Sequence, residues 1–542
     1  MNHLYSEKRK YMKHSKLTAL LCALVMTGAG SMSAFAADAA PAAAAAPAAA
    51  AATAAQPAKA QETTAAAGTP AEAAQPEVNY TEALLKGMSL TLPDVEKAVE
   101  AGTFKNLSPE APKPAEPEPA PAPEPIPEPE PTPAPEPEPE PEPAPTPAQT
   151  AKYTADQGTS AATIETDGTY DAQTYTSTTA DQNALRVSYA YMSAAGDTFT
   201  KTGDATNTES SNQYGMNAAL LVTHGGHGAF TKASITSSAL GAPGAFGYSK
   251  GTYLNLTDST VTTTGNNSPA LETAERAMMK VVNTTVSTSG YASPAMKVSQ
   301  NGGMILAESS HFTTTGKDSH GAYVNGDVTL TNSSVNAQNT KAAVVRNNNT
   351  LSLENSTLEG NETGSVPYNI VLYADPSAIG TMGVQQFNAT GSTLISHHGG
   401  MFLVTGTHNR ITLKKTTLQQ DPGLPILSAI GNDGAYGWGT PGANGGHVEL
   451  IADEETLNGD IVVDTISDVN LTLRNNSVWT GAITIIPNAQ GGEKYKTNAD
   501  IFIGAGSVWN LTADSQATTV NNLGTINFNG HTITLADGTV LK

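Results

Sequence analysis

The chain has 542 residues and a net charge of −22, and charged side chains make up only 14% of it. An acidic chain without basic clusters does not suit nucleic acid or anionic lipid, so we expect no nucleic-acid partner. The single cysteine, Cys22, lies close to the N-terminus. A long chain without a second cysteine must be held together by buried apolar side chains and backbone hydrogen bonds rather than by disulfides.

Residues 1–36 have the pattern of an export signal. A basic stretch is followed by an uncharged run from Leu17 to Met26 and by Ala34-Phe35-Ala36, the small-x-small form of a signal-peptidase site. The apolar run is too short to remain as a membrane-spanning helix. We therefore expect export through the Sec pathway and a mature chain without a transmembrane segment, associated with the cell surface or outer membrane or released outside the cell. The basic residues are Lys8, Arg9, Lys10, Lys13 and Lys16.

Three segments of different composition follow the signal. Residues 37–76 are mostly Ala, Pro, Thr and Gln, which cannot build a core, and are predicted to be a disordered tether. Residues 77–105 contain a helical pattern that starts at Pro93-Asp94 and are predicted to be a short helical segment. Residues 106–149 alternate Pro with Glu and Ala, which favours polyproline II and predicts an extended, rigid stalk.

Residues 150–542 contain an internal repeat. Each copy is an octapeptide that reads apolar, any, apolar, any, Asn/Asp/Glu, Ser/Thr, Ser/Thr and then usually apolar. The ends of the first five copies are separated by 25, 25, 24 and 23 residues. Later copies begin at Phe387, Ile411, Leu471 and Ile501, and the wider gaps 361–383 and 431–446 are predicted to be loops. The first five copies are 254–261, 279–286, 304–311, 328–335 and 351–358.

A β-prone repeat of roughly 24 residues is typical of a parallel β-helix with three short strands per coil. The prediction is therefore an all-β, single-stranded, right-handed parallel β-helix over residues 150–542, with its first coils at 185–192 and 218–222. Alternation predicts that Leu254, Leu256 and Val261 face the core and that Asn255 and Thr257 face outward. A second strand in each coil is predicted at positions such as 268–271 and 292–296. One turn is predicted to carry a stacked polar column of Asp258, Asn283, Glu308, Asn332 and Asn355.

The coil-forming region 185–360 resembles a group of bacterial surface proteins with the pectin-lyase-like β-helix fold. The likeness is carried by residues 217–222, 233–236, 244–248 and 259–265. The later stretches Ser477-Val478-Trp479 and Ser507-Val508-Trp509 resemble the end of an autotransporter passenger, here without its C-terminal barrel. The resemblance implies display on a cell surface and adhesion.

A polysaccharide-active enzyme is the alternative, because the same fold carries lyases and glycoside hydrolases. The only dense carboxylate cluster, Asp453-Glu454-Glu455, is predicted to lie in a solvated turn, since neighbours on a strand face opposite sides. Basic residues that could act as a catalytic base are scattered. We therefore expect a non-enzymatic protein with no catalytic residue and no cofactor. The scattered basic residues are Lys280, Lys297, Lys341, Arg346 and Arg410.

Two histidine pairs are the candidate metal ligands, His224 with His227 and His397 with His398. A metal site needs a third ligand and supporting hydrogen bonds, so we interpret both pairs as exposed turn histidines and predict no metal site.

Threonine runs at 262–264 and 313–315 raise the alternative of a flat array that matches an ice lattice. The coil between them has Ser287-Thr288-Ser289 and the next coil has Asn336-Ala337-Gln338, so we expect the array to fail there.

The 431–446 loop holds two aromatic residues, Tyr436 and Trp438, which we predict to be ligand contacts. The expected partners are glycans or matrix proteins on a host or neighbouring cell surface. They would bind a monomer through the long faces and inserted loops of the β-helix.

Overall fold

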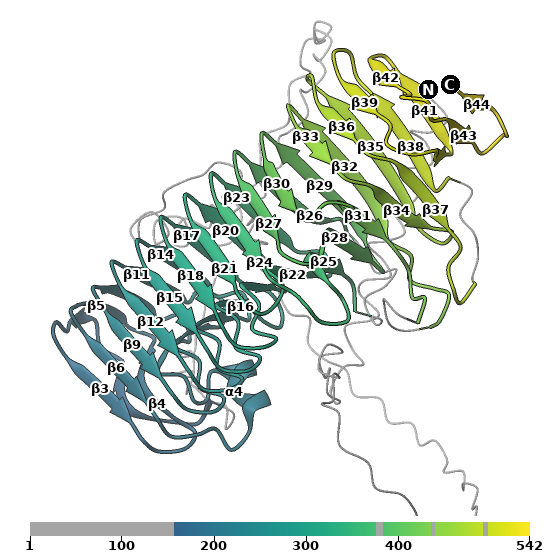
Figure 1. Cartoon of the computed structure of the whole chain (residues 1–542). Helices are drawn as coiled ribbons and strands as arrows, with labels where there is room; N and C mark the ends of the chain where they lie inside the picture. The colour runs from purple at the N-terminus through teal and green to yellow at the C-terminus, as the bar shows by residue number, and fades with distance from the viewer. Residues whose placement is uncertain (1–156, 376–382, 435–439, 492–496) are drawn as a thin grey trace, which may run out of the picture.

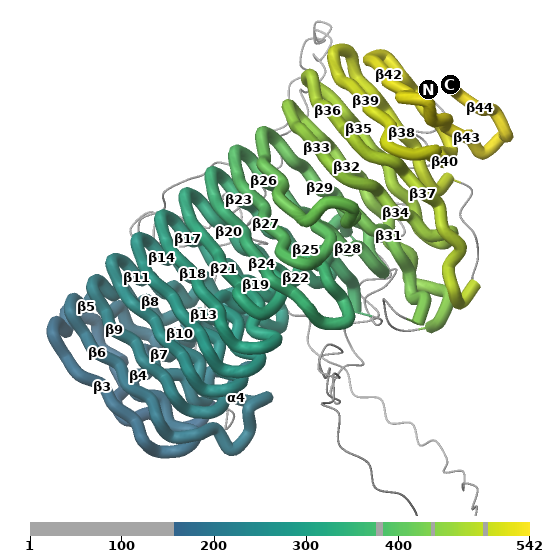
Figure 2. The backbone as a smooth tube through the Cα atoms, in the orientation of Figure 1, coloured from purple at the N-terminus to yellow at the C-terminus, as the bar shows by residue number. Residues whose placement is uncertain are grey.

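The computed structural model describes residues 157–375, 383–434, 440–491 and 497–542. The signal, tether, helical segment and stalk predicted between residues 1 and 149 lie outside the described residues and stay predictions. In the described part, parallel strands stack coil upon coil into a rod, which confirms the predicted parallel β-helix (Figure 1). Figure 2 shows the chain winding through these coils from the N-terminal to the C-terminal end of the rod.

Three long parallel sheets run along the rod, and each complete coil contributes one strand to each sheet in the order A, B, C. Sheet A has 13 strands and sheet B has 14 strands. The strands of sheet A are β1 (Thr159–Ile164), β4 (Gln182–Ser188), β7 (Leu220–Thr223), β10 (Ala245–Tyr248), β13 (Leu271–Ala274), β16 (Met296–Val298), β19 (Ala322–Val324), β22 (Ala343–Arg346), β25 (Tyr368–Tyr373), β28 (Gly400–Thr405), β31 (Leu427–Ala429), β34 (Ile461–Asp464) and β37 (Ile483–Ile486). The strands of sheet B are β2 (Gly168–Thr169), β5 (Tyr191–Ala195), β8 (His227–Thr231), β11 (Tyr253–Thr257), β14 (Met278–Val282), β17 (Met304–Glu308), β20 (Asp327–Thr331), β23 (Thr350–Glu354), β26 (Gln385–Thr390), β29 (His408–Lys414), β32 (His447–Asp453), β35 (Asp468–Arg474), β38 (Ala499–Ile503) and β41 (Thr519–Asn522).

Sheet C has ten strands, and the four-stranded sheet D continues it along the rod (Figure 1). The strands of sheet C are β3 (Thr174–Ser177), β6 (Thr198–Lys201), β9 (Ser234–Ser237), β12 (Thr260–Thr263), β15 (Thr285–Thr288), β18 (His311–Thr314), β21 (Ser334–Ala337), β24 (Thr357–Gly360), β27 (Thr393–Ser396) and β30 (Thr417–Gln420). Sheet D contains β33 (Thr456–Asn458), β36 (Val478–Thr480), β39 (Val508–Asn510) and β42 (Thr525–Asn527). A small sheet E of β40 (Ser515–Ala517), β43 (Ile533–Leu535) and β44 (Val540–Leu541) ends the rod.

The core is one continuous apolar column inside the rod. A single cluster of buried residues runs from Leu185 to Ile533, so each coil packs on the coils before and after it. The predicted alternation is confirmed, because Leu254, Leu256 and Val261 are fully buried while their neighbours on the strand face outward. The first coil lies before the one predicted at 185–192, since β1 begins at Thr159.

The third copy of the repeat was placed one residue too early. Met279 pairs with Ile305 rather than Met304, and buried Phe312 takes the inward position that the sequence prediction gave to His311. The stacked turn column therefore contains Ser309 and not Glu308. This column consists of Asp258, Asn283, Ser309, Asn332 and Asn355, all left-handed with φ between 47° and 51°. Asn and Asp tolerate this conformation better than most residues, which explains their recurrence.

Two further predictions need correction. The segment 361–383, predicted to be a loop, contains strand β25, whose six residues are all buried in sheet A. The second strand of each coil starts later than predicted, since β13 begins at Leu271 and β16 begins at Met296. Apolar runs such as Ile370-Val371-Leu372 lack the alternation used to find strands, because their outward side chains are also covered.

One helix interrupts the coils in the described part of the chain. Helix α4 (Thr208–Tyr214) lies between β6 and β7. Asn207 caps its first turn by accepting a hydrogen bond from the Ser210 amide, and left-handed Gly215 ends it. The C-terminal end of the helix packs on Leu221 and Phe246, which face outward from sheet A. Gly215 lies so close to them that a Cβ there would come within 3.1 Å of both side chains.

Candidate interaction surface

The corners of the rod differ in how constant the length of their turns is. The turn from sheet B to sheet C has two residues in nine consecutive coils, such as Asp258-Ser259 in the coil of β11 and β12, and the turn from β32 to β33 of sheet D has the same length. The connections from sheet A to sheet B, which we call the A–B corner, are long in three coils. These long connections are residues 374–384, 430–446 and 487–498.

The long connections alternate with short ones. Between the first and second lies the short turn 406–407, and between the second and third lies the short turn 465–467. Each long connection therefore has a neighbouring coil over which it can extend. Insertions gathered on one side of a repeat protein are the usual way in which such proteins build a binding surface.

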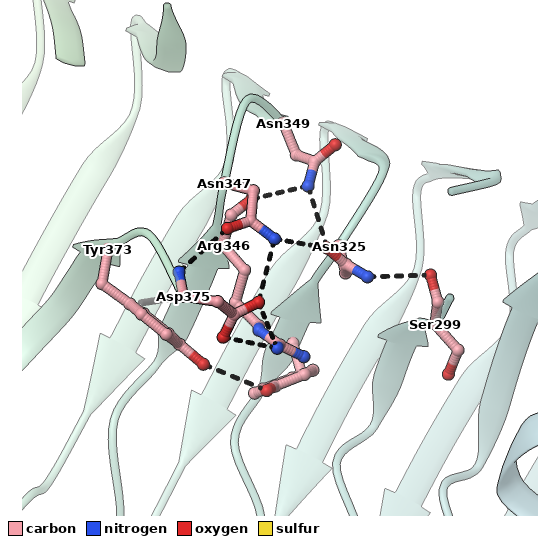
Figure 3. A network of polar contacts seen from close by, with 8 residues as sticks. Ser299, Asn325, Arg346, Asn347, Asn349, Tyr373 and Asp375 are labelled. Atoms are coloured by element: carbon pink, nitrogen blue, oxygen red, sulfur yellow. Dashed lines mark hydrogen bonds and ion pairs between the residues drawn. The ribbon is translucent and has the colours of Figure 1, made fainter. Parts of the chain in front are cut away.

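The first long connection leaves sheet A from a charged and aromatic cluster (Figure 3). Arg346 at the end of β22 donates from Nη2 to both carboxylate oxygens of Asp375, at 2.7 and 2.6 Å. Its guanidinium group lies 5.4 Å from the ring centre of Tyr323 and 5.7 Å from that of Tyr373. The two tyrosine hydroxyls are 3.3 Å apart. This combination of ion pair and cation–π contacts fixes Asp375, the second residue of the connection.

A row of asparagines completes this cluster (Figure 3). Asn347 donates to Asp375 at 3.0 Å and accepts from the Asp375 amide at 3.0 Å. Both Asn347 and Asn349 donate to Asn325 in the preceding coil, which donates in turn to the Ser299 carbonyl. The polar network thus spans four coils and connects the start of the loop to the rigid rod.

The electrostatics of the cluster favour a permanently charged arginine. Burial alone would lower the pKa of Arg346, but Tyr323, Tyr373 and Asp375 together raise it above its usual value. Burial raises the pKa of Tyr373 well above its usual range. Over the physiological pH range Arg346 therefore stays charged and Tyr373 stays neutral.

The second and third long connections are held by one buried carboxylate. Asp464 ends β34 in the coil between them and is only 1% exposed. Its Oδ2 accepts from the Gly431 amide at 2.9 Å and from Asn488 Nδ2 at 2.7 Å, and its Oδ1 accepts from the Ile466 amide. Asn498, at the far end of the third connection, donates to the carbonyls of Asp464, Thr465 and Ser467.

The described ends of these two connections also touch each other. Gln490 Nε2 donates to the Asp433 carbonyl at 3.4 Å. The Gly442 backbone approaches so closely that a Cβ there would come within 2.9 Å of the Gln490 carbonyl oxygen. The short turn 465–467 therefore lies between the described ends of the second and third long connections, which contact each other.

Two histidines lie next to this short turn, as the first residues of the sheet B strands β29 and β32. The rings of His408 and His447 are stacked with centres 4.5 Å apart, and His447 Nδ1 is hydrogen-bonded to Asp468 Oδ1. Burial lowers the pKa of His408 and His447 lowers it further, while Asp468 opposes both effects. His408 is therefore neutral near pH 7.

The two histidine pairs considered as candidate metal ligands contact other side chains. His224 stacks on exposed Tyr189 with ring centres 5.0 Å apart, whereas His227 lies between Tyr191 and Tyr253. His397 contacts Glu359 at 2.8 Å and His398 contacts Asn361 at 2.7 Å. Within the described ranges, no group of three His, Cys, Asp or Glu side chains is placed to hold a metal ion.

The prediction that the carboxylate cluster 453–455 lies in a solvated turn is wrong, because two of its three side chains are buried. Asp453 and Glu455 are 5% and 3% exposed, and only Glu454 faces solvent. Asp453 pairs with Arg474 of the next coil at 2.8 Å. Glu455 occupies the position that holds Ser or Thr in most other coils, where its Oε2 accepts from the Thr416 amide at 2.8 Å. The three carboxylates therefore do not converge on a common point as a hydrolase site requires.

Tyr436 and Trp438 lie outside the described residues, so their contact with a ligand stays a prediction. The sequence prediction placed the second long connection correctly but missed the anchors Arg346–Asp375 and Asp464. The partners in both clusters are separated by more than twenty residues and by insertions of variable length. No local motif marks them.

The outward face of sheet C differs from what the threonine runs suggested. Thr263 and Thr314 face inward and are buried, so the runs at 262–264 and 313–315 are not flat outward arrays. The outward positions are the first and third residues of each strand. They read Thr-x-Thr, Thr-x-Thr, Ser-x-Thr, Thr-x-Thr, Thr-x-Ser and His-x-Thr from β3 to β18, which is longer than predicted.

No protein-family model, no curated protein and no solved structure matches this chain. Within the parts of the chain that the structure describes, no helix is both long and apolar enough to cross a membrane. What the structure does show is a long all-β solenoid of stacked parallel strands.

Proposed function

We propose that the protein is an exported, surface-displayed β-helix that acts as a non-enzymatic adhesin. The partners would be glycans or matrix proteins of a host or neighbouring cell. The observation that carries the proposal is the A–B corner, where three long connections gather on a rigid rod and are anchored by the Arg346–Asp375 and Asp464 clusters. Loops presented by a rigid framework are a common design for recognition, because little conformational entropy is lost when they bind.

The export signal and the Pro/Glu-rich stalk of the sequence support the same proposal. So does the resemblance to pectin-lyase-like surface proteins and autotransporter passengers. The 39 residues from 109 to 147, the most proline-rich part of the stalk, would at roughly 3.1 Å per residue hold the rod on the order of 120 Å from its point of attachment. Recognition at a distance needs such a spacer.

Binding of the full-length mature chain to immobilised glycans and matrix proteins tests the proposal. The variant Asp464→Asn removes one of the acceptors that hold the second and third connections, so binding is expected to weaken about tenfold. The matched control is Asp460→Asn, the same chemical change at the residue just before β34. Asp460 accepts a hydrogen bond from the Ala482 amide. Circular dichroism checks that both variants keep the β-helix.

Two outcomes would contradict the proposal. Equal binding by both variants and the unchanged chain would show that the A–B corner is not the recognition surface.

Incubation with acidic polysaccharides, followed by the absorbance of unsaturated products or by the release of reducing ends, tests the enzymatic alternative. Sustained turnover would replace adhesion with catalysis.

A further inference from the structure

The outward side of sheets C and D forms a face with almost no charge, which we call the hydroxyl face. It consists of the first and third residues of the fourteen strands of these sheets. All of these side chains are half-buried or exposed. The first positions are Thr174, Thr198, Ser234, Thr260, Thr285, His311, Ser334, Thr357, Thr393, Thr417, Thr456, Val478, Val508 and Thr525. The third positions are Thr176, Thr200, Thr236, Thr262, Ser287, Thr313, Asn336, Glu359, Ile395, Gln419, Asn458, Thr480, Asn510 and Asn527.

Charge is distributed very unevenly between this face and the neighbouring one. Glu359 is the only Asp, Glu, Lys or Arg on the hydroxyl face, and it is hydrogen-bonded to Asn336 and His397. The outward positions of sheet B, by contrast, carry eleven charged residues. These are Lys280, Glu308, Asp327, Glu354, Arg410, Lys414, Glu449, Asp453, Asp468, Arg474 and Asp500.

We propose that the hydroxyl face binds the same face of a second copy of this chain. A chain of net charge −22 repels its own copies, so close approach is possible only where charge is absent. At physiological ionic strength, charges more than about 8 Å away are largely screened. Two copies docked through this face would keep their charged sheet B surfaces apart.

The chemistry of the face is self-complementary. Hydroxyl and amide side chains each donate and accept hydrogen bonds, so a face built from them can pair with itself through a two-fold axis. Such bonds already link neighbouring coils, as between Thr262 and Ser287 at 3.2 Å and between Asn527 and Asn510 at 2.7 Å. The β-branched threonines have stiff side chains, so little side-chain entropy is lost on docking.

The size of the face fits a weak dimer. Fourteen strands about 4.8 Å apart extend over about 60 Å, and three residues of strand span about 10 Å. One copy would therefore bury about 600 Å², at the lower end of the range for specific interfaces. No outward position on the face holds Phe, Tyr or Trp, so a sugar ring would find no aromatic side chain on which to stack. A second copy is the better fit, in place of the monomer expected from the sequence.

Sedimentation velocity of the full mature chain over the micromolar concentration range tests this inference. We expect a reversible dimer that strengthens as salt is raised, because salt screens the repulsion between acidic copies. The variant Thr236→Glu with Thr262→Glu places like charges on the face and should raise the dimer dissociation constant about tenfold or more. A dimer that weakens with salt would point to a charged interface and overturn the proposal.

The matched control is Thr231→Glu with Thr257→Glu. It makes the same chemical change in the same two coils, but on sheet B. It should leave the dimer unchanged. Mixing the Thr236→Glu/Thr262→Glu variant with Thr236→Lys/Thr262→Lys should restore dimers, which shows that the first variant is folded. A monomer at all concentrations, or equal weakening by the control, would contradict the proposal, as would a monomer that binds ice or a neutral polysaccharide through this face.

Discussion

Glu455 differs from the short hydroxyl residues that most coils carry at the same position of the turn. The second residue of the turn that follows a sheet B strand carries a short hydroxyl in most coils, but in the turn from β32 to β33 it is a carboxylate that is only 3% exposed. Burial raises its pKa to about 7, although hydrogen bonds from the Thr416 and Thr456 amides act in the opposite direction. The carboxyl group therefore takes up a proton more readily in the folded chain than in the unfolded chain.

This shift predicts pH-dependent stability near the C-terminal coils. Because the pKa of Glu455 is raised from its usual 4.5 to about 7, the folded chain binds more protons between these values. The free energy of unfolding should fall as pH rises from 4.5 through 7. Glu455→Gln keeps an acceptor and should flatten this dependence, as followed by urea unfolding with fluorescence of the buried Trp479 and Trp509. Glu454→Gln, at the exposed neighbour, is the control, and an equal effect there would count against the assignment.

Trp479 and Trp509 form a second critical site at the residue scale. Their rings are stacked 4.7 Å apart at an angle of 13°, and both side chains are fully buried. Each indole donates to a glycine carbonyl, of Gly459 and Gly481 respectively. The two residues therefore fill the core where sheet D replaces sheet C.

Truncation of this stack should destabilise the C-terminal coils locally. Trp479→Ala is expected to cost about 3–5 kcal/mol, since it leaves a large cavity in the core. Trp479→Phe should cost less because it keeps most of the packing. Hydrogen exchange of β33, β36 and β39 measures the effect. If exchange in β8 and β11 accelerated as much, the loss would be global and the local interpretation would fail.

At the scale of one element, the turn from sheet B to sheet C carries a ladder of hydroxyl groups. The amide of each ladder residue donates to the side chain of the ladder residue in the next coil, as from Thr284 to Ser310 at 3.1 Å and from Ser310 to Ser333 at 3.1 Å. Each hydroxyl donates back to a carbonyl of its own turn, such as Ser310 to Glu308 at 2.8 Å. The buried turns thus keep their backbone groups hydrogen-bonded without a sheet.

Loss of one hydroxyl group should remove one of the hydrogen bonds that connect neighbouring coils in this ladder. Ser310→Ala leaves the buried Thr284 amide without its acceptor, which should cost about 1–3 kcal/mol. Exchange of the Thr284 amide with deuterium should accelerate more than that of its neighbours. The partly exposed neighbouring Ser334 provides the control, as Ser334→Ala leaves the ladder intact. Unchanged exchange at Thr284 would show that the ladder contributes little.

The strands and turns of the repeat show how much of the structure could be predicted from the sequence. The inward and outward positions followed from alternation, because apolar and polar residues separate cleanly in most coils. The third copy slipped by one residue because Met304 and Ile305 are both apolar and Ser309 and Ser310 are both hydroxyls, so the pattern fits two registers. The anchors Arg346–Asp375 and Asp464 could not be predicted, because each depends on which side chains the insertions bring back to the rod.

The whole molecule is a one-dimensional stack, so stability should depend on position along it. Each coil contacts only its neighbours, and the end coils lack a partner on one side. Apolar residues at the ends, such as Ile164 and Val520, are only partly buried, whereas almost all core residues between them are fully buried. Hydrogen exchange should therefore be slowest in β14 to β29 and faster toward β1 and β43. Uniform exchange along the rod would mean that it unfolds as one cooperative unit.

The contrast between the two corners of the coil has an evolutionary consequence. The turn from sheet B to sheet C has a fixed length, since its ladder and left-handed residue must stay in step with the coils on both sides. The A–B corner has no such constraint and accepts segments of very different length without shifting the register of the strands. New sequences can therefore be exchanged at the A–B corner one loop at a time while the rod beneath stays the same. Such a molecule can change its surface quickly under selection, and the same corner offers a natural place to graft foreign peptides.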